Sequence, residues 1–406
     1  MSAARLRIAL VAACPFPSPQ GSQVFVGQMA ERLAGRGHEV HLVTYGQGRD
    51  LSAPGIRHHR IARLPGDDST RSGPNLAKPL LDAMLAARLV QVARGHAIDV
   101  LHAHNYEAAV AALVARSRAG VPVVYHSHNL MGDELETYFE GRPARALASR
   151  AGRLLDRAVP RRADRTIALC EWSAVRLREA GCRPAAVSVI PPAVDDEGAL
   201  PVREEDRRAL GLAPGDLVVG YVGNLDAYQN LPVLLDAVAR LDGVAGPGRI
   251  VLLVATHAAA GEVRALRERG RPLGDRLVVV EAEGHAGARR ALAASDVVAL
   301  PRRLGSGYPV KLLNSLGAAK AIVTAGCGSK VIRDGVDGLV VGDDDPGALA
   351  AAIDRCLRDP AMRAALGEEA RRTYLGSMTW EKVLPQVEGV YASLREDRVA
   401  SGRRQS

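Results

Sequence analysis

The chain is poor in aromatic residues and has no pattern of paired cysteines. Aromatic residues make up 3% of its 406 residues. The cysteines are odd in number, widely spaced and never arranged as CxxC, which argues against a disulfide framework and against a zinc site. We therefore expect reduced thiols and a cytoplasmic protein. The five cysteines are Cys14, Cys170, Cys182, Cys327 and Cys356.

Long apolar runs are also missing, as are two familiar phosphate-binding signatures. No run reaches the roughly 20 residues that a membrane-spanning helix needs. The first apolar run, residues 8–14, is too short for a signal peptide and is followed by Pro15 and Pro17. Neither GxGxxG nor GxxxxGK[ST] occurs in the sequence, which excludes the dinucleotide fingerprint and the P-loop.

The net charge of +8 is concentrated in the first half of the chain. Residues 1–195 hold 25 Lys/Arg against 17 Asp/Glu, whereas residues 196–406 hold 28 against 28. Spacings of three and four place four arginines on one helix face, which suits an anionic membrane surface or a phosphorylated acceptor, and equally suits a solvated face. Because aromatic residues do not interleave with this stripe, nucleic acid is not an expected partner. The stripe is Arg150, Arg153, Arg157 and Arg161.

Short apolar runs alternate with helical patterns along the whole chain, which predicts an α/β protein with parallel sheets. The length exceeds that of a usual single core, and a proline-rich stretch around Pro191, Pro192 and Pro201 separates two similar halves. We predict two doubly wound Rossmann-like domains facing across a cleft where ligands bind. The expected bounds are 1–195, 196–378 and a last helix at 379–406 that returns to the first domain and ends in a disordered basic tail.

The stretch GSGYPVKLLNSLGAAKAIVT, residues 305–324, suggests an anion site. It follows an apolar strand and Arg302, and it carries Lys311 near the start of a helix. Helix N-termini and nearby cations favour phosphate groups. The run GDDDPG looks like a metal-binding DxD, but Asp345 and Pro346 fit a helix N-cap and its first residue better. We therefore predict no catalytic metal.

Taken together, an ordered set of motifs resembles the GT-B fold glycosyltransferases of family 4, which are retaining nucleotide-sugar enzymes. The resemblance runs from residue 7 to residue 393. The matching stretches are PFPSPQGSQVFVGQMAERLAGRGHEVHLVT, DVLHAHNYEAAVAAL, VPVVYHSHN, VIPPAVD, GYVGNLDAYQNLPVLLDA, SDVVALPRR, SGYPVKLLNSLGAAKAIVT, IRDGVDGLVV and TWEKV.

The resemblance implies a hexosyltransferase without a cofactor that moves a sugar from a UDP- or GDP-linked donor. The acceptor would be a glycan, a lipid or a secondary-metabolite scaffold. Its catalytic residues would be His128, which matches the family histidine at the donor sugar, together with Lys311 and Arg302 at the diphosphate. Gly21, Ser22 and Gly307 would also bind the donor. Candidates on the acceptor side are Gln23, His104 and Asp133.

Four positions depart from the family pattern. Asn224 and Gln229 replace an arginine and a lysine, while Ser306 and Asn314 replace two glutamates. We expect these residues to contact the donor in a divergent branch with YQN and GYPVKLLN motifs. The losses leave two alternatives open, namely a nucleotide-sugar epimerase or hydrolase on the same fold, and an inactive nucleotide-sugar-binding protein.

Overall fold

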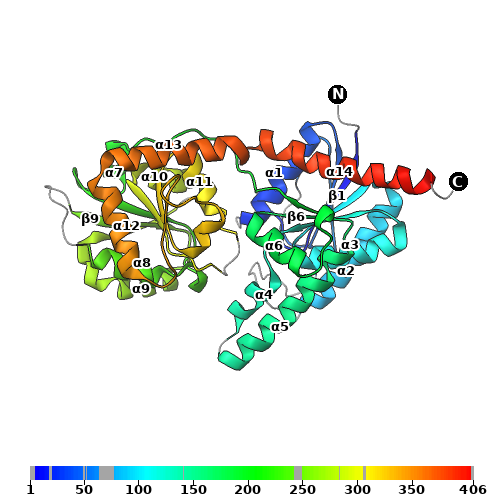
Figure 1. The fold of residues 1–406 in the computed structure, drawn as a ribbon, viewed down its shortest axis with the longest axis horizontal. Coiled ribbons are helices and arrows are strands. Elements are labelled where there is room, and N and C mark those ends of the chain that lie inside the picture. The colour runs from blue at the N-terminus through cyan, green and yellow to red at the C-terminus, as the bar shows by residue number, and fades with distance from the viewer. Residues whose placement is uncertain are drawn as a thin grey trace. The chain divides into compact units, whose positions relative to one another are not determined.

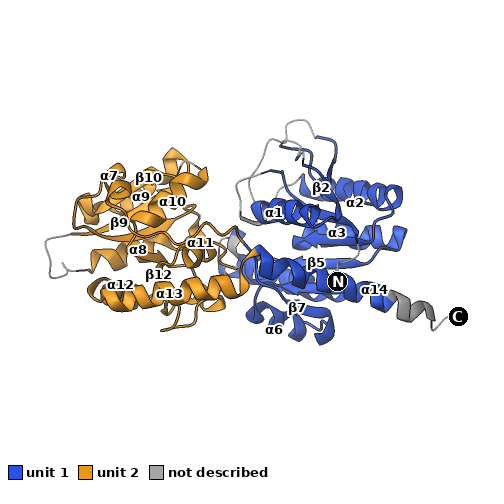
Figure 2. Ribbon diagram, turned by 90° about the horizontal axis from the view of Figure 1, so that it is seen from above, with its two compact units in different colours: residues 1–193, 380–406 blue, residues 194–379 orange. Residues whose placement is uncertain are grey.

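A computed structural model describes residues 5–17, 21–48, 51, 53–63, 77–139, 141–241, 249–282, 284–304 and 308–403. The chain forms two compact units, residues 1–193 with 380–406 and residues 194–379 (Figure 2). These limits differ by one or two residues from the limits expected from the sequence. The last helix belongs to the first unit, and the chain beyond residue 403 lies outside the described residues.

Unit 1 contains a parallel sheet of seven strands in the order β3-β2-β1-β4-β5-β6-β7. Every neighbouring pair is parallel, so paired strands are joined by crossovers, most of which contain a helix. The chain leaves β1 in one direction and returns to its other side at β4, which makes β1 and β4 the switch point of the sheet. The strands are β1 (Arg7–Ala12), β2 (Glu39–Thr44), β3 (Ile56–Arg60), β4 (Val100–His104), β5 (Val123–Ser127), β6 (Arg165–Ala168) and β7 (Val187–Val189).

Helices cover both faces of this sheet. On one face, α1 and α14 share a core with β1, and on the other α2 and α3 pack over a second core (Figure 1). Helix α14 contributes Trp380 and Tyr391 to the first of these cores. It is therefore an integral part of unit 1. The helices of unit 1 are α1 (Gly21–Gly35), α2 (Lys78–Gly95), α3 (Asn105–Ala119), α4 (Met131–Glu134), α5 (Arg142–Ala158), α6 (Glu171–Glu179) and α14 (Trp380–Arg403).

Unit 2 repeats this plan with six parallel strands in the order β10-β9-β8-β11-β12-β13. Its switch point lies between β8 and β11. The strands are β8 (Leu217–Val222), β9 (Ile250–Thr256), β10 (Leu277–Glu281), β11 (Val297–Leu300), β12 (Ala321–Thr324) and β13 (Leu339–Val340). The helices are α7 (Glu204–Ala209), α8 (Leu231–Ala239), α9 (Ala260–Arg269), α10 (Gly284–Ala294), α11 (Lys311–Gly317), α12 (Pro346–Arg358) and α13 (Pro360–Ser377).

The start of α12 confirms the capping role expected of the GDDDPG run. Asp345 is the N-cap, its Oδ1 accepts a hydrogen bond from the Ala348 amide at 2.8 Å, and Pro346 is the first helical residue. The carboxylate therefore satisfies an amide that the helix itself leaves unpaired.

Two strands were not expected from the sequence. β3 reads IRHHR and is an edge strand with mostly half-buried side chains, so it lacks the apolar run that marks a buried strand. β7 has three residues and forms the other edge of the same sheet. The apolar pattern of the sequence does not reveal these two strands, because edge strands bury less of their surface.

Candidate functional site

The switch point of unit 2 gathers residues that are distant in sequence. β8 and β11 pair in parallel, with Val219 opposite Val297. The chain then continues from the carboxyl end of β8 through residues 223–230, and from that of β11 through Pro301 and Arg302. Because ligands of doubly wound sheets bind beyond these strand ends, this is the expected ligand site of unit 2.

Lys311, the first residue of α11, directs its ammonium group toward the end of β8. Its Nζ donates a hydrogen bond to Asn224 Oδ1 at 2.9 Å and another to Tyr221 Oη at 3.2 Å. The ammonium also lies 5.2 Å from the centre of the Tyr221 ring. Both hydrogen-bond acceptors are neutral, so neither of these contacts balances the charge.

The environment disfavours a charged Lys311. Burial, followed by repulsion from Arg302, lowers the pKa of Lys311 from 10.5 to about 7, although the carboxylate of Asp226 acts in the opposite direction. Near neutral pH the neutral form of Lys311 is therefore much more favoured than for a lysine in water. An anion bound here would restore the full charge, so the site is suited to a negatively charged ligand.

The two positions where the family places cations form a neutral hydrogen-bonded pair. Gln229 Nε2 donates to Asn224 Oδ1 at 2.7 Å, and Asn224 Nδ2 donates to Tyr228 Oη at 3.1 Å. Gln229 is fully buried, and its Oε1 has no hydrogen-bond partner within the described part of the chain. A buried acceptor without a partner is costly.

Gly223 makes room for the lysine. Its φ is +148°, in a region that L side chains rarely adopt, and a Cβ there would lie 2.0 Å from Lys311 Nζ. Glycine is thus the residue that lets the ammonium reach the end of β8.

Arg302 joins this group through an aromatic ring. Its guanidinium carbon lies 4.7 Å from the centre of the Tyr228 ring, a favourable cation–π distance. The structure therefore brings together Lys311, Arg302, Asn224 and Gln229, as the sequence suggested. Asn314 is exposed and lines a cavity of about 40 Å³ whose lining does not include Lys311. Ser306 and Gly307 lie outside the described residues.

In unit 1, four histidines line the sheet face that α1 and α14 cover. His104 Nδ1 and His128 Nε2 are 3.1 Å apart, and His102 Nε2 and His126 Nδ1 are also 3.1 Å apart. Tyr391 Oη lies 2.6 Å from His102 Nδ1. The ring of Phe25 is roughly perpendicular to three of these imidazoles and is stacked against the ring of Trp380.

These histidines are neutral at physiological pH. Burial lowers the pKa of His128 to about 4 and that of His102 to about 3, in the latter case together with the nearby His128. His104 and His126 shift well downward for the same reason, and the Nε2 of each is buried with no partner among the described atoms. His128 can therefore form hydrogen bonds but is a poor proton donor.

The remaining residues singled out in unit 1 lie in α1 and α4, the helices that follow β1 and β5 in the chain. Gly21 and Ser22 begin α1, and nothing is described of their side chains. Gln23 follows them, is 6% exposed, and has an unpartnered Oε1. Asp133 in α4 lies 3.5 Å from the Arg176 guanidinium, and its second oxygen is buried without a described partner.

The arginine stripe lies mainly on α5. Arg150, Arg153 and Arg157 are exposed on this helix, and Arg161 follows in a short 3-10 turn. Two leucines on α5 are also unusually exposed, Leu147 at 70% and Leu154 at 65%. The surface of α5 thus combines positive charge with exposed apolar side chains.

Tyr221, Tyr228 and the pair Phe25–Trp380 were not identified as site residues from the sequence. Tyr221 contacts Lys311 and Tyr228 contacts Arg302. Phe25 contacts three of the four histidines. A weak signal existed for Tyr221, because it stands in the short run GYVG, two residues before Gly223.

Two doubly wound, Rossmann-like units on one chain are the elements of the GT-B architecture. Family descriptions agree, since "Glycosyltransferase Family 4" matches residues 19–197 and "Glycosyl transferases group 1" matches residues 216–359. The chain therefore belongs to the family 4 glycosyltransferases of the GT-B fold.

Curated relatives match nearly the whole chain. The D-inositol 3-phosphate glycosyltransferase of Actinosynnema mirum is 29% identical over 93% of this chain and 93% of its own length. The enzyme of the same name from Mycobacterium ulcerans is 28% identical, covering 98% and 88%. These names support transferase activity for the present chain.

Solved structures share the fold at low identity. Sucrose-phosphate synthase from Thermosynechococcus elongatus superposes with a TM-score of 0.82 at 20% identity, covering 97% of this chain and all of that one. HepE from Anabaena, in complex with UDP-glucose, gives a TM-score of 0.71 at 20% identity, covering 97% and 100%. Among the described residues, no helix is both long and apolar enough to cross a membrane.

The depressed pKa of Lys311 predicts a pH dependence of stability. Between about pH 7 and 10 the unfolded chain binds a proton at Lys311 that the folded chain does not. The free energy of unfolding should therefore rise with pH in this window, by at most about 1.4 kcal/mol per pH unit. Urea unfolding of the wild type and of Lys311→Met, compared at several pH values, measures this term.

Lys382→Met is the matched control, because Lys382 is exposed on α14. The difference in unfolding free energy between wild type and Lys311→Met should change across the window, while the difference for Lys382→Met stays constant. If the unfolding free energies of all three proteins change with pH in parallel, the charged form of Lys311 is not destabilised by its surroundings.

Proposed function

We propose that this glycosyltransferase takes a sugar from a UDP-linked donor, transfers it to an acceptor hydroxyl, and retains the configuration at the anomeric carbon. The observation that carries this proposal is the partly buried Lys311 ammonium, which is held by neutral oxygens at the switch point of unit 2. UDP is favoured over GDP because the HepE structures with the same fold contain UDP or UDP-glucose.

The leaving group explains the need for this lysine. When the bond between the anomeric carbon and the phosphate oxygen breaks, negative charge develops on the diphosphate. A cation already in place stabilises that charge without a reorganisation of its surroundings. The arriving diphosphate raises the pKa of Lys311 from about 7, so the lysine becomes charged when the ligand is bound. Arg302 supplies a second cation.

Retention follows from attack on the face that the diphosphate leaves. In this scheme the acceptor oxygen bonds to the anomeric carbon, the carbon–phosphate oxygen bond breaks, and the acceptor proton passes to an oxygen of the released diphosphate. The carboxylate of Asp226 is already engaged in the polar cluster, because it accepts a hydrogen bond from Asn224 Nδ2. The scheme assigns to His128 the role of a neutral hydrogen-bond partner for the donor sugar.

The acceptor side is proposed to favour a phosphorylated or otherwise anionic molecule. Unit 1 carries most of the net positive charge of the chain, and the curated relatives are named for transfer to D-inositol 3-phosphate. Electrostatic attraction raises the rate of encounter with an anionic acceptor.

Titration calorimetry with UDP tests the donor site. We expect wild type to bind UDP more tightly than GDP, and Lys311→Ala to weaken UDP binding by about 10- to 100-fold, as the loss of charged hydrogen bonds worth about 1.5–3 kcal/mol requires. Lys382→Ala should bind like wild type. Equal affinity of Lys311→Ala and wild type for UDP would remove the lysine from the donor site.

Proton NMR of the reaction products tests the stereochemistry. With a UDP-α-sugar and an accepted hydroxyl compound, the new glycosidic bond should be α. A β product would refute retention. Conversion of the donor without any acceptor would instead indicate an epimerase or hydrolase, and donor binding without conversion in the presence of a broad acceptor panel would indicate a binding protein.

Helix α5 is proposed to contact anionic membrane surfaces through its arginines and exposed leucines. Basic amphipathic helices bind such surfaces by charge and by apolar insertion.

We expect the protein to co-sediment with vesicles that contain phosphatidylglycerol and not with vesicles of pure phosphatidylcholine. The double substitution Arg150→Glu with Arg157→Glu should reduce this co-sedimentation severalfold. The control pair, Arg264→Glu with Arg271→Glu on exposed positions of unit 2, should sediment like wild type. Unchanged sedimentation of the α5 variant would exclude this helix.

A further inference from the structure

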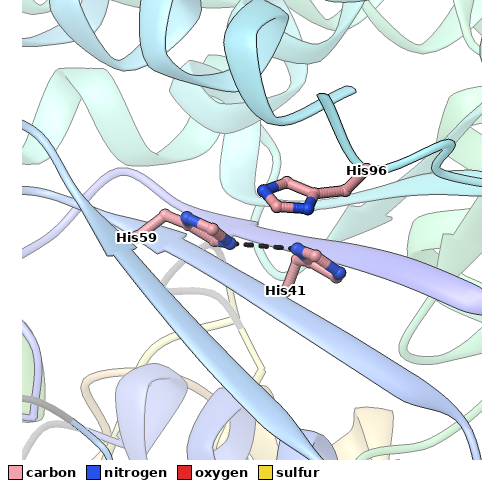
Figure 3. Close-up of side chains that lie close together, drawn as sticks. All are labelled: His41, His59 and His96. Carbon is pink, nitrogen blue, oxygen red and sulfur yellow. Dashed lines mark hydrogen bonds between the residues drawn. The ribbon is translucent and has the colours of Figure 1, made fainter. Parts of the chain in front are cut away.

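A second group of histidines lies on the opposite face of the unit 1 sheet, under α2 (Figure 3). His41 comes from β2 and His59 from β3, while His96 directly follows α2. One nitrogen from each of the three rings lies within 4.8 Å of the others. The mechanism proposed above does not use these residues, and they lie in a different unit from Lys311.

Both ring nitrogens of His41 have defined neighbours. Nδ1 lies 2.9 Å from His59 Nε2, and Nε2 lies 3.2 Å from Glu39 Oε1. Glu39 also forms ion pairs with Arg57, at 3.3 Å, and with Arg7, at 3.7 Å. These ion pairs favour the ionised form of the carboxylate. A proton on Nε2 of His41 lets the neutral ring donate to this carboxylate and leaves its lone pair on Nδ1, which accepts a hydrogen bond from His59 Nε2–H. A bound cation would take the place of that proton, with His59 then carrying its proton on Nδ1.

This arrangement matches how proteins prepare a histidine for a metal ion. A ligating imidazole commonly donates its other N–H to a carboxylate, which fixes the tautomer and orients the ring. Here Glu39 would take that part for His41. The hydrogen bond between His41 and His59 holds together two nitrogens that an ion would separate to about 3.3 Å, the spacing expected at a tetrahedral zinc with bonds of about 2.0–2.1 Å.

The burial of the three residues gives the site both rigidity and access. His41 is fully buried, whereas His59 and His96 are partly exposed. His96 stands just past the end of α2, and one of its nitrogens lies within 4.8 Å of a nitrogen of each of the other two rings. Solvent can therefore reach the open side of the group and supply a fourth ligand.

The other histidine group is a poorer candidate, although His102, His104 and His126 also lie close together. The second nitrogen of His102, Nδ1, faces the neutral hydroxyl of Tyr391 and not a carboxylate. All three rings are at most 1% exposed, and no carboxylate hydrogen bonds to them are found among the described residues. A dication without a compensating charge would be costly in that core.

We propose that His41, His59 and His96 bind one zinc-like divalent cation, with Glu39 as the positioning carboxylate and water as the fourth ligand. The ion would tie the edge strand β3 and the end of α2 to β2. Its role is structural, because the site lies under α2 and away from the carboxyl end of β4 and β5 that carries His104 and His128. Nearby arginines reduce the affinity relative to a site with carboxylate ligands.

The experiment uses the full-length protein without a polyhistidine tag, freed of metal with a chelator. Titration with zinc chloride should show one bound equivalent, and the melting temperature should rise. Titration with cobalt chloride should give the intense visible absorption of tetrahedral cobalt. His59→Ala and His96→Ala should each weaken zinc binding by about 100-fold or more, and Glu39→Gln by about 10- to 100-fold.

His257→Ala, at an exposed position of unit 2, is the matched control and should bind zinc like wild type. Circular dichroism of each apo variant checks that it is folded, and the cobalt spectrum of the wild type needs no variant at all. The proposal is overturned if wild type binds no equivalent of zinc, if cobalt shows only octahedral absorption, or if the folded His59→Ala and His96→Ala proteins still bind one equivalent with unchanged affinity.

Discussion

The account depends on one interaction, the placement of the Lys311 ammonium against neutral oxygens at the end of β8. Its two hydrogen-bond acceptors are the hydroxyl of Tyr221 and the amide oxygen of Asn224. Burial then disfavours the charge, and Arg302 adds to this effect. A fold that keeps an unbalanced cation in this position has a free energy cost that a bound anion removes. Functional sites commonly carry such a cost, and stability is provided elsewhere.

The surrounding structure is arranged to keep that lysine in place. Gly223 removes the Cβ that would collide with Nζ. The amides of Asn224 and Gln229 occupy the positions where other family members have cations. They bind each other, and Asn224 also accepts a hydrogen bond from the lysine. A third and fourth positive charge beside Lys311 would lower its pKa further. The neutral pair therefore makes this site less positive than the family pattern, and we propose that the single lysine, with Arg302, carries the anion-binding role.

Much of the architecture could be predicted from sequence, because buried parallel strands leave strong apolar runs. Strands such as Val297–Leu300 and Ala321–Thr324 are runs of buried, mostly apolar residues of this kind. The edge strand β3 was missed since its IRHHR sequence has no apolar period, and the same polar character brings His59 beside His41. The cysteine spacing argued against zinc, but it carries no information about histidines brought together by a sheet. In the candidate site, the resemblance pointed to Lys311 and His128. The contacts of Tyr221 and Tyr228 and the shifted pKa of the lysine depend on packing that no spacing in the sequence shows.

The most direct measurement is a crystal structure of the full-length enzyme with UDP bound. The account predicts diphosphate oxygens within hydrogen-bonding distance of Lys311 Nζ, with the guanidinium of Arg302 facing the same group. The carboxyl ends of β8 and β11 should border the nucleotide. A structure in which UDP binds elsewhere, and Lys311 keeps its contacts to Tyr221 and Asn224 with no phosphate nearby, would contradict the central claim.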